Sequence, residues 1–308
     1  MHDLKRPPAD VQPAARALDQ AAVDAALRRM ARQAQPPWLH AEVARRMTQR
    51  LGIVKLQPET VLEWWGHTGA SGALLAAAYP KARRIVVEPS NALAQRSRVE
   101  AQAPWWSARR WARATEVRCD DPAPGAAQLL FANMMLHAVA DPPALLARWQ
   151  RLLAVDGFVM FSCLGPDTLR ELRGLYRRLG WPAPAPEFVD MHDLGDMLVQ
   201  AGFADPVMDQ ETLTLTWDSP QALLAELRSL GGNVSSARWP ALRTPRWRER
   251  LHAALQSLAG PDGRLHLSFE IVYGHAFRAP PRAPLSGETT VSLEDMRAMV
   301  RAAGGPRG

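Results

Sequence analysis

Glu63 and Glu88 each end a short apolar segment, and they stand about 25 residues apart. A carboxylate at the carboxyl end of a strand can accept hydrogen bonds from both hydroxyls of a ribose. Gly66 and Gly69 follow Glu63, and glycine lets the backbone approach a nucleotide closely. The two acids could instead be solvated strand ends, but their matching positions favour a nucleotide site.

The elements that would position these residues alternate between strands and helices. Strands are expected at 60–63, 84–88, 116–119, 128–132 and 158–164, and helices at 21–34, 38–51, 73–79, from 92, and at 141–153. This alternation predicts a doubly wound α/β fold with a mostly parallel sheet. In such a sheet, ligands bind at the carboxyl ends of the strands.

The second half of the chain differs in pattern. Helices are expected at 167–179, 193–201 and 220–230, strands at 211–217 and 266–277, and an Arg-rich amphipathic stretch at 237–264. A strand, a helix and a strand at the end of the chain predict an antiparallel edge on the sheet. The domains expected are a flexible tail (1–20), one domain (21–278) with a cofactor half (53–165) and a substrate-covering region (166–265), and a C-terminal tail (279–308).

The loop after the first strand, from Glu63 to Gly69, resembles the first motif of the class I S-adenosylmethionine-dependent methyltransferases, an acid followed by Gly-x-Gly-x-Gly. Glu63 and Gly69 match this motif, whereas Trp65 and His67 stand at its first two glycine positions. A Trp side chain there would fill space that the cofactor takes in the family. A residue other than glycine is also restricted in its backbone angles.

More specific resemblance lies downstream, to the biotin-pathway malonyl-[acyl-carrier protein] O-methyltransferases. The similar strings are 131–139, 161–169, 188–198, 201–203, 227–233 and 268–276. They extend over about residues 130–278. The resemblance implies a Rossmann-like, seven-stranded fold that uses S-adenosylmethionine.

The resemblance also assigns residues to the cofactor. Glu88 would bind the ribose and Asp120 the adenine amino group, and the backbone around Asn133 and His137 would line the methyl end. The cofactor-binding set implied is Glu63, Gly66, Gly69, Glu88, Asp120 and Asn133. The chain departs from the family between Asp120 and the fourth strand, where its connection is shorter and Gln128 replaces an acid.

For the acceptor, the resemblance suggests contact with His137 and with Arg228, which would hold a substrate carboxylate. A surface ion pair is the alternative role for Arg228. A carboxylate acceptor is already ionised, so no catalytic acid or base is expected. His192, His266 and His275 lack metal-ligand spacing, and no metal is expected.

The chain is basic, with a net charge of +6 and a pI of about 10.0, mostly from arginine. The arginines are spread along the sequence, which favours a solvated basic surface and an acidic partner such as acyl-carrier protein over nucleic acid. Two cysteines, a charged N-terminus and the lack of a long apolar stretch predict a cytoplasmic protein with no membrane span.

Three functions remain open from the sequence. The first is O-methylation of a malonyl-acyl-carrier-protein carboxylate in biotin synthesis. The second is a non-catalytic assembly or regulatory factor that keeps the sheet but has lost its cofactor, which Trp65 and His67 favour. The third is methylation of a different acceptor, because a fold does not determine its substrate.

Overall fold

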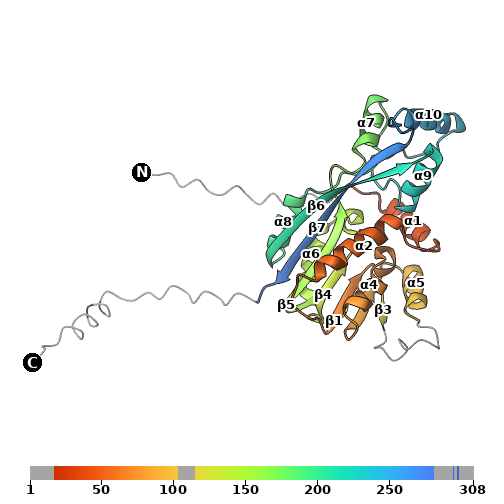
Figure 1. Cartoon of the computed structure of the whole chain (residues 1–308). Helices are drawn as coiled ribbons and strands as arrows, with labels where there is room; N and C mark the ends of the chain where they lie inside the picture. The colour runs from red at the N-terminus through yellow and green to blue at the C-terminus, as the bar shows by residue number, and fades with distance from the viewer. Residues whose placement is uncertain (1–16, 103–114, 281–293, 295–296, 298–308) are drawn as a thin grey trace, which may run out of the picture.

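A single mixed sheet of seven strands organises the computed structural model, which describes residues 17–102, 115–280, 294 and 297 (Figure 1). Its strand order is β3-β2-β1-β4-β5-β7-β6. The strands are β1 (Thr60–Trp64), β2 (Arg83–Val87), β3 (Glu116–Arg118), β4 (Ala127–Ala132), β5 (Leu153–Leu164), β6 (Phe203–Trp217) and β7 (Leu265–Arg278). β1 to β5 are parallel, and β7 runs antiparallel to both β5 and β6. The predicted fold class is confirmed, with the antiparallel strand second from the edge.

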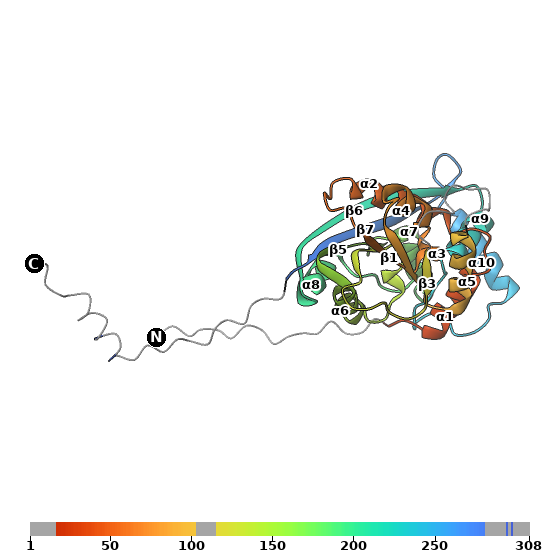
Figure 2. The same ribbon diagram turned by 90° about the horizontal axis from the view of Figure 1, so that it is seen from below.

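Helices cover both faces of the sheet (Figures 1 and 2). They are α1 (Gln20–Met30), α2 (Trp38–Leu51), α3 (Gly66–Gly69), α4 (Gly72–Ala78), α5 (Asn91–Ala101), α6 (Pro142–Leu152), α7 (Arg170–Arg178), α8 (Met191–Gln200), α9 (Pro220–Ser229) and α10 (Pro245–Gln256). A short 3₁₀ turn, η2 (Leu136–Ala138), follows β4. These helices provide the two layers that a doubly wound sheet needs.

Alternating strand residues build two separate cores, because successive side chains of a strand point to opposite faces. Val61 and Leu129 join α2 and α4 in one core, and their neighbours Leu62 and Leu130 join α6 and α8 in the other. All four are fully buried. The carboxyl ends of β1 and β4 are thereby held rigidly side by side.

Several boundaries differ from the sequence prediction. β5 and β6 begin earlier than expected, at Leu153 and Phe203, because antiparallel pairing with β7 extends β6. The loop expected after β1 contains the helical turn α3. The predicted tails lie mostly outside the described residues, although Leu18 bridges to Ser235 and Asp19 caps α1. Residues 103–114 also lie outside them.

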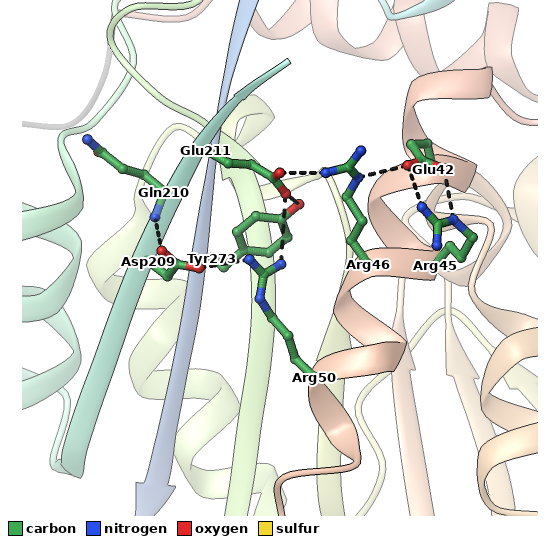
Figure 3. A network of polar contacts seen from close by, with 8 residues as sticks. All are labelled: Glu42, Arg45, Arg46, Arg50, Asp209, Gln210, Glu211 and Tyr273. Atoms are coloured by element: carbon green, nitrogen blue, oxygen red, sulfur yellow. Dashed lines mark hydrogen bonds and ion pairs between the residues drawn. The ribbon is translucent and has the colours of Figure 1, made fainter.

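Arginines of α2 are paired with carboxylates on the β6 edge of the sheet (Figure 3). Arg46 contacts Glu211 at 2.5 Å, and Arg50 contacts Asp209 at 2.7 Å. The hydroxyl of Tyr273 donates to Glu211. Hydrogen bonds from Arg45 and Arg46 lower the pKa of Glu42 to about 2. On this side of the molecule, therefore, positive charge is balanced locally.

None of the helices in the described part of the chain is long and apolar enough to cross a membrane.

Candidate active site

The predicted cofactor residues lie at the carboxyl ends of neighbouring strands, around the point where the strand order reverses between β1 and β4. Glu63 is the second-last residue of β1, and Glu88 directly follows β2. Asp120 follows β3, and Asn133 follows β4. Ligands of open α/β sheets bind at this switch point. The fold thus brings these residues to one edge of the sheet, as predicted.

Glu88 is buried, with 1% of its surface exposed, and so it is not a solvated strand end. Its Oε1 accepts hydrogen bonds from the backbone N–H of His67 at 2.7 Å and from the Ser97 hydroxyl at 2.6 Å. Its Oε2 finds no hydrogen-bond partner among the described residues. Burial raises the pKa of Glu88 to about 7, against the lowering effect of these two donors.

The turn that replaces the glycine loop is fixed by contacts from three other segments. Thr68 O lies 2.7 Å from Nδ1 of His40 on α2, which therefore donates to it. Gly69 O accepts from the side-chain amide of Asn133 at 2.6 Å. The Nδ1 atom of His67 lies 2.7 Å from a carboxylate oxygen of Glu100 on α5. The turn is consequently closed over Glu88.

Trp65 enters this turn in the left-handed region, with φ of 56°, as the motif glycine it replaces could do without a steric cost. Its side chain is half-buried. It lines the cavity that lies beside the turn. The expectation that this Trp fills space taken by the cofactor in the family stays a prediction.

The two glycines of the turn have different surroundings. A Cβ atom on Gly66 would lie 2.8 Å from Val86 Cγ1 and 3.2 Å from Glu63 Oε2. A Cβ atom on Gly69 would meet Asn133 only at 3.5 Å, an ordinary contact. Gly66 is therefore required by the close packing of the turn on β2, whereas Gly69 contributes mainly its carbonyl.

Glu63 is buried, with 1% exposed, and its partners belong to the protein itself. Arg84 on β2 donates to Oε1 of Glu63, with its Nε atom at 2.8 Å, and the Ser71 hydroxyl donates to Oε2 at 3.2 Å. This buried ion pair joins β1, β2 and the start of α4. The solvated-end alternative is wrong for Glu63 as well.

Asp120 and Asn133 differ in how available they are to a ligand. The carboxylate of Asp120 is exposed at the end of β3, and a hydrogen bond from Arg118 lowers its pKa. Asn133 is buried, and its amide donates to Gly69 O and to His40 O while its oxygen accepts from Ser162. Asn133 therefore joins α2, the turn and β5 through its side chain.

A mostly apolar cavity of about 270 Å³ lies beside the turn. Trp65, Thr68, Met134 and His137 line it from the carboxyl ends of β1 and β4. Helices α1 and α9 and the segment from Gly231 to Val234 line it from the substrate-covering side. His137 and Arg228, both predicted to contact an acceptor, are thus brought to the same cavity.

Arg228 lines this cavity while it remains exposed to solvent, and it forms no ion pair with any described residue. Among the described residues, Arg228 therefore does not form the surface ion pair that was its alternative role. A second guanidinium, that of Arg29, lies near it; burial and the charge of Arg228 lower the pKa of Arg29. Arg228 thus brings to the cavity a positive charge that has no ion-pair partner among the described residues, whereas Arg29 donates to the carbonyl of Gly231 at 2.7 Å.

Sequence reasoning missed several lining residues, notably His40, Tyr176 and Phe188. His40 occurs within an ordinary amphipathic helix, so no local signal distinguishes it from a core residue. Burial lowers its pKa to about 4. Phe188 packs edge-on to His137 at 6.1 Å, and only the family-like string around it could have indicated a role.

Comparison with known proteins decides the family. A family model described as "Methyltransferase domain" matches residues 30–205. A malonyl-[acyl-carrier protein] O-methyltransferase from Laribacter hongkongensis is 38% identical, over 80% of this chain and 86% of its own length. One from Gallionella capsiferriformans is 36% identical, over 82% and 88%. The chain belongs to this methyltransferase family.

The enzyme class and the fold predicted from the sequence are therefore confirmed: this is a methyltransferase, and S-adenosylmethionine is its cofactor. Among solved structures, the YcgJ protein of Bacillus subtilis aligns with a TM-score of 0.53 at 9% identity, covering 76% of this chain and 98% of that protein. At that identity the likeness concerns the fold alone.

The described residues fit this cofactor in their chemistry. Oε2 of Glu88 is a buried acceptor without a donor among the described residues, which suits a ribose hydroxyl. Glu88 itself does not line the cavity. The turn at residues 66–69 and Ser97 of α5 both contact this carboxylate.

Proposed function

We propose that this methyltransferase transfers a methyl group to the free carboxylate of a malonyl group carried by an acyl-carrier protein, as the names of its relatives say of them. The observation that carries the proposal is the cavity itself. It joins the carboxyl ends of β1 and β4 to α9, and Arg228 lines it. The setting implied by the resemblance is biotin synthesis in the cytoplasm.

The acceptor is recognised by its charge. Arg228 has no carboxylate partner among the described residues, so its guanidinium is available for two parallel hydrogen bonds to a substrate carboxylate. Because Arg228 is exposed, the two-point geometry of this pair, and not burial, provides its specificity. Arg29 lies nearby, but it does not line the cavity and its guanidinium donates to the carbonyl of Gly231 at 2.7 Å, so Arg228 is the arginine assigned to the acceptor.

The residues around the cavity position the acceptor and do not transfer protons. Bound S-adenosylmethionine supplies a methyl group that is already activated by its sulfonium charge. A carboxylate is ionised at neutral pH, so no general base is required. Arg228 and the ring of His137 would hold the carboxylate in line, and the apolar walls exclude water from the reacting atoms.

For the cofactor itself, we assign Glu88 to the ribose and the exposed Asp120 to the adenine amino group. Trp65, Met134 and the backbone that follows Asn133 would surround the methyl end. Glu63 and the side chain of Asn133 act on the cofactor indirectly, because they fix the turn and the ends of β1 and β4. We also propose the domain limits predicted from the sequence, with a cofactor half at 53–165 and a substrate-covering region at 166–265.

The decisive experiment mixes the purified protein with methyl-labelled S-adenosylmethionine and malonyl-carrier protein. We expect label in a base-labile ester on the carrier protein. Acetyl-carrier protein, which has no free carboxylate, is the matched control and should remain unlabelled. Labelling of both would indicate another acceptor atom, and labelling of neither by a folded sample that binds the cofactor would overturn the acceptor proposal.

A further inference from the structure

Two arginine-rich segments that are far apart in the sequence lie close together in the fold. The segment 170–178, which is α7, and the segment 238–250, which ends in α10, hold nine arginines and two glutamates. Their combined charge of +7 exceeds the +6 of the whole chain. α7, α9 and α10 lie together at one end of β6 and β7 (Figures 1 and 2). We call the two segments the α7–α10 surface.

Most of this charge lacks a local partner, unlike the paired arginines of α2. Of the nine arginines, Arg170 and Arg238 are in ion pairs, with Glu171 and Asp19. Arg177, Arg246 and Arg250 have no carboxylate partner among the described residues. An unbalanced charge of one sign raises the local potential and attracts a partner of the opposite sign.

Aromatic side chains are interleaved with these arginines. The guanidinium of Arg243 lies 4.4 Å from the ring centre of Trp239 and 4.2 Å from that of Trp247. Trp247 packs on Trp181 at 5.6 Å, and Arg250 lies over Trp181. Trp239 is 46% exposed. Exposed Trp and Arg are the residue types that dominate binding energy at protein interfaces.

The α7–α10 surface is continuous with the acceptor cavity. Tyr176 of α7 packs edge-on against Trp181 at 5.1 Å and lines the acceptor cavity. A second cavity, of about 760 Å³, is lined by Arg177 and Trp181 and shares Tyr176 and the segment 184–186 with the first. A partner on this surface would therefore stand next to a route to the reaction site.

We propose that the α7–α10 surface is the docking site of an acidic carrier protein, whose flexible arm enters beside Tyr176. This inference rests on the proposed function, because it takes the acceptor to be attached to such a protein. Charge complementarity selects the occupant: an acidic helix is matched by the arginines of this surface that have no ion pair among the described residues, and the paired arginines around α2 offer nothing comparable.

The test compares two acceptors that share a malonyl thioester, malonyl-carrier protein and malonyl-pantetheine. Arg246→Glu and Arg250→Glu are made separately; the two residues are four positions apart and share a face of α10. Arg151→Glu is the matched control, an exposed arginine in the last turn of α6 without an ion pair among the described residues; it lies near the amino end of β5, at the opposite end of the strands from α10. Thermal unfolding establishes that each variant is folded.

We expect kcat/KM for malonyl-carrier protein to fall roughly tenfold or more in both α10 variants, mainly through KM, since like charges then face each other. Malonyl-pantetheine should react at the wild-type rate, and Arg151→Glu should leave both acceptors unchanged. Added salt should weaken the reaction of the carrier protein alone. An equal loss for both acceptors, or no loss for either, overturns the docking site.

Failure of the proposed function gives a different result. Wild-type protein that methylates neither acceptor refutes the acceptor assignment, and the docking site is then decided by fluorescence anisotropy of labelled malonyl-carrier protein. Binding that the α10 variants lose supports the surface, and binding that they retain overturns it. Salt-steep binding of single-stranded RNA, lost in the same variants while carrier-protein binding persists, would assign the surface to nucleic acid instead.

Discussion

The backbone N–H of His67 donates to Oε1 of Glu88 over 2.7 Å, so a residue that replaces a motif glycine occupies the carboxylate assigned to the ribose. His40, Asn133 and Glu100 hold the same turn in place. The free energy needed to open the turn is subtracted from the free energy of cofactor binding. If Glu88 binds the ribose, we therefore expect cofactor affinity to depend on the stability of this short turn.

Restoring the motif should loosen this coupling. In the variant Trp65→Gly/His67→Gly, the turn loses the imidazole that contacts Glu100, and the cavity gains the space of the Trp65 side chain. We expect S-adenosylhomocysteine to bind roughly tenfold more tightly by isothermal titration calorimetry, equivalent to about 1.4 kcal/mol. The control Trp239→Gly/His252→Gly changes the same residue types in and beside α10 and should not alter affinity. Unchanged or weaker binding in the first variant would show that the turn does not limit affinity.

The raised pKa of Glu88 predicts a specific dependence of stability on pH. Glu88 keeps its proton up to its raised pKa of about 7 in the folded state, whereas the unfolded chain releases it near the ordinary glutamate pKa of 4.5. Between these values the folded state binds more protons, so the Glu88 contribution to stability falls as pH rises. In Glu88→Gln this fall should be absent, and at pH 8 the variant should be more stable than wild type by about 1–3 kcal/mol.

Urea denaturation of both proteins from pH 5 to pH 8 measures this difference. His40 acts in the opposite direction, because its pKa is lowered to about 4 and its contribution is lost as pH falls below 6.5. The difference between wild type and Glu88→Gln cancels the His40 effect. A difference that does not change with pH would mean that Glu88 stays ionised in the fold. The variant should also lose cofactor binding at least tenfold, since a neutral amide accepts hydrogen bonds more weakly than a carboxylate.

The sequence was sufficient for the strands and for the position of Glu88, because apolar periodicity and a terminal acid are local signals. It could not predict the closed turn, whose contacts come from His40 on α2 and Asn133 after β4, far away along the chain. The same limit applies to charge. Arginines that look scattered in the sequence converge only when α7 and α10 pack together. Local patterns therefore predicted the sheet and the motif, and tertiary contacts decided the state of the site.

Arg228 should affect the acceptor and leave the cofactor unaffected. Arg228→Gln removes a charge-assisted hydrogen bond worth about 1.5–3 kcal/mol, so KM for malonyl-carrier protein should rise about tenfold or more. Affinity for S-adenosylhomocysteine should be unchanged. Arg228→Lys should recover part of the loss, because it keeps the charge but not the planar fork. Arg32→Gln, an exposed arginine just past α1 with no ion pair among the described residues, is the control. Equal effects of the two Gln variants would remove Arg228 from the acceptor site.

The two glycines of the turn should respond differently to alanine. In Gly66→Ala the new methyl group would lie 2.8 Å from Val86 Cγ1 and 3.2 Å from Glu63 Oε2, so β2 or the turn must shift. Overpacking of this kind costs typically about 1–3 kcal/mol, measurable by urea denaturation. Gly69→Ala meets Asn133 at an ordinary 3.5 Å and should cost less than about 1 kcal/mol. If Gly69→Ala nevertheless abolishes cofactor binding without loss of stability, Gly69 is needed by the ligand and not by the fold. If Gly66→Ala is as stable as wild type, the turn is looser than its packing on Val86 indicates.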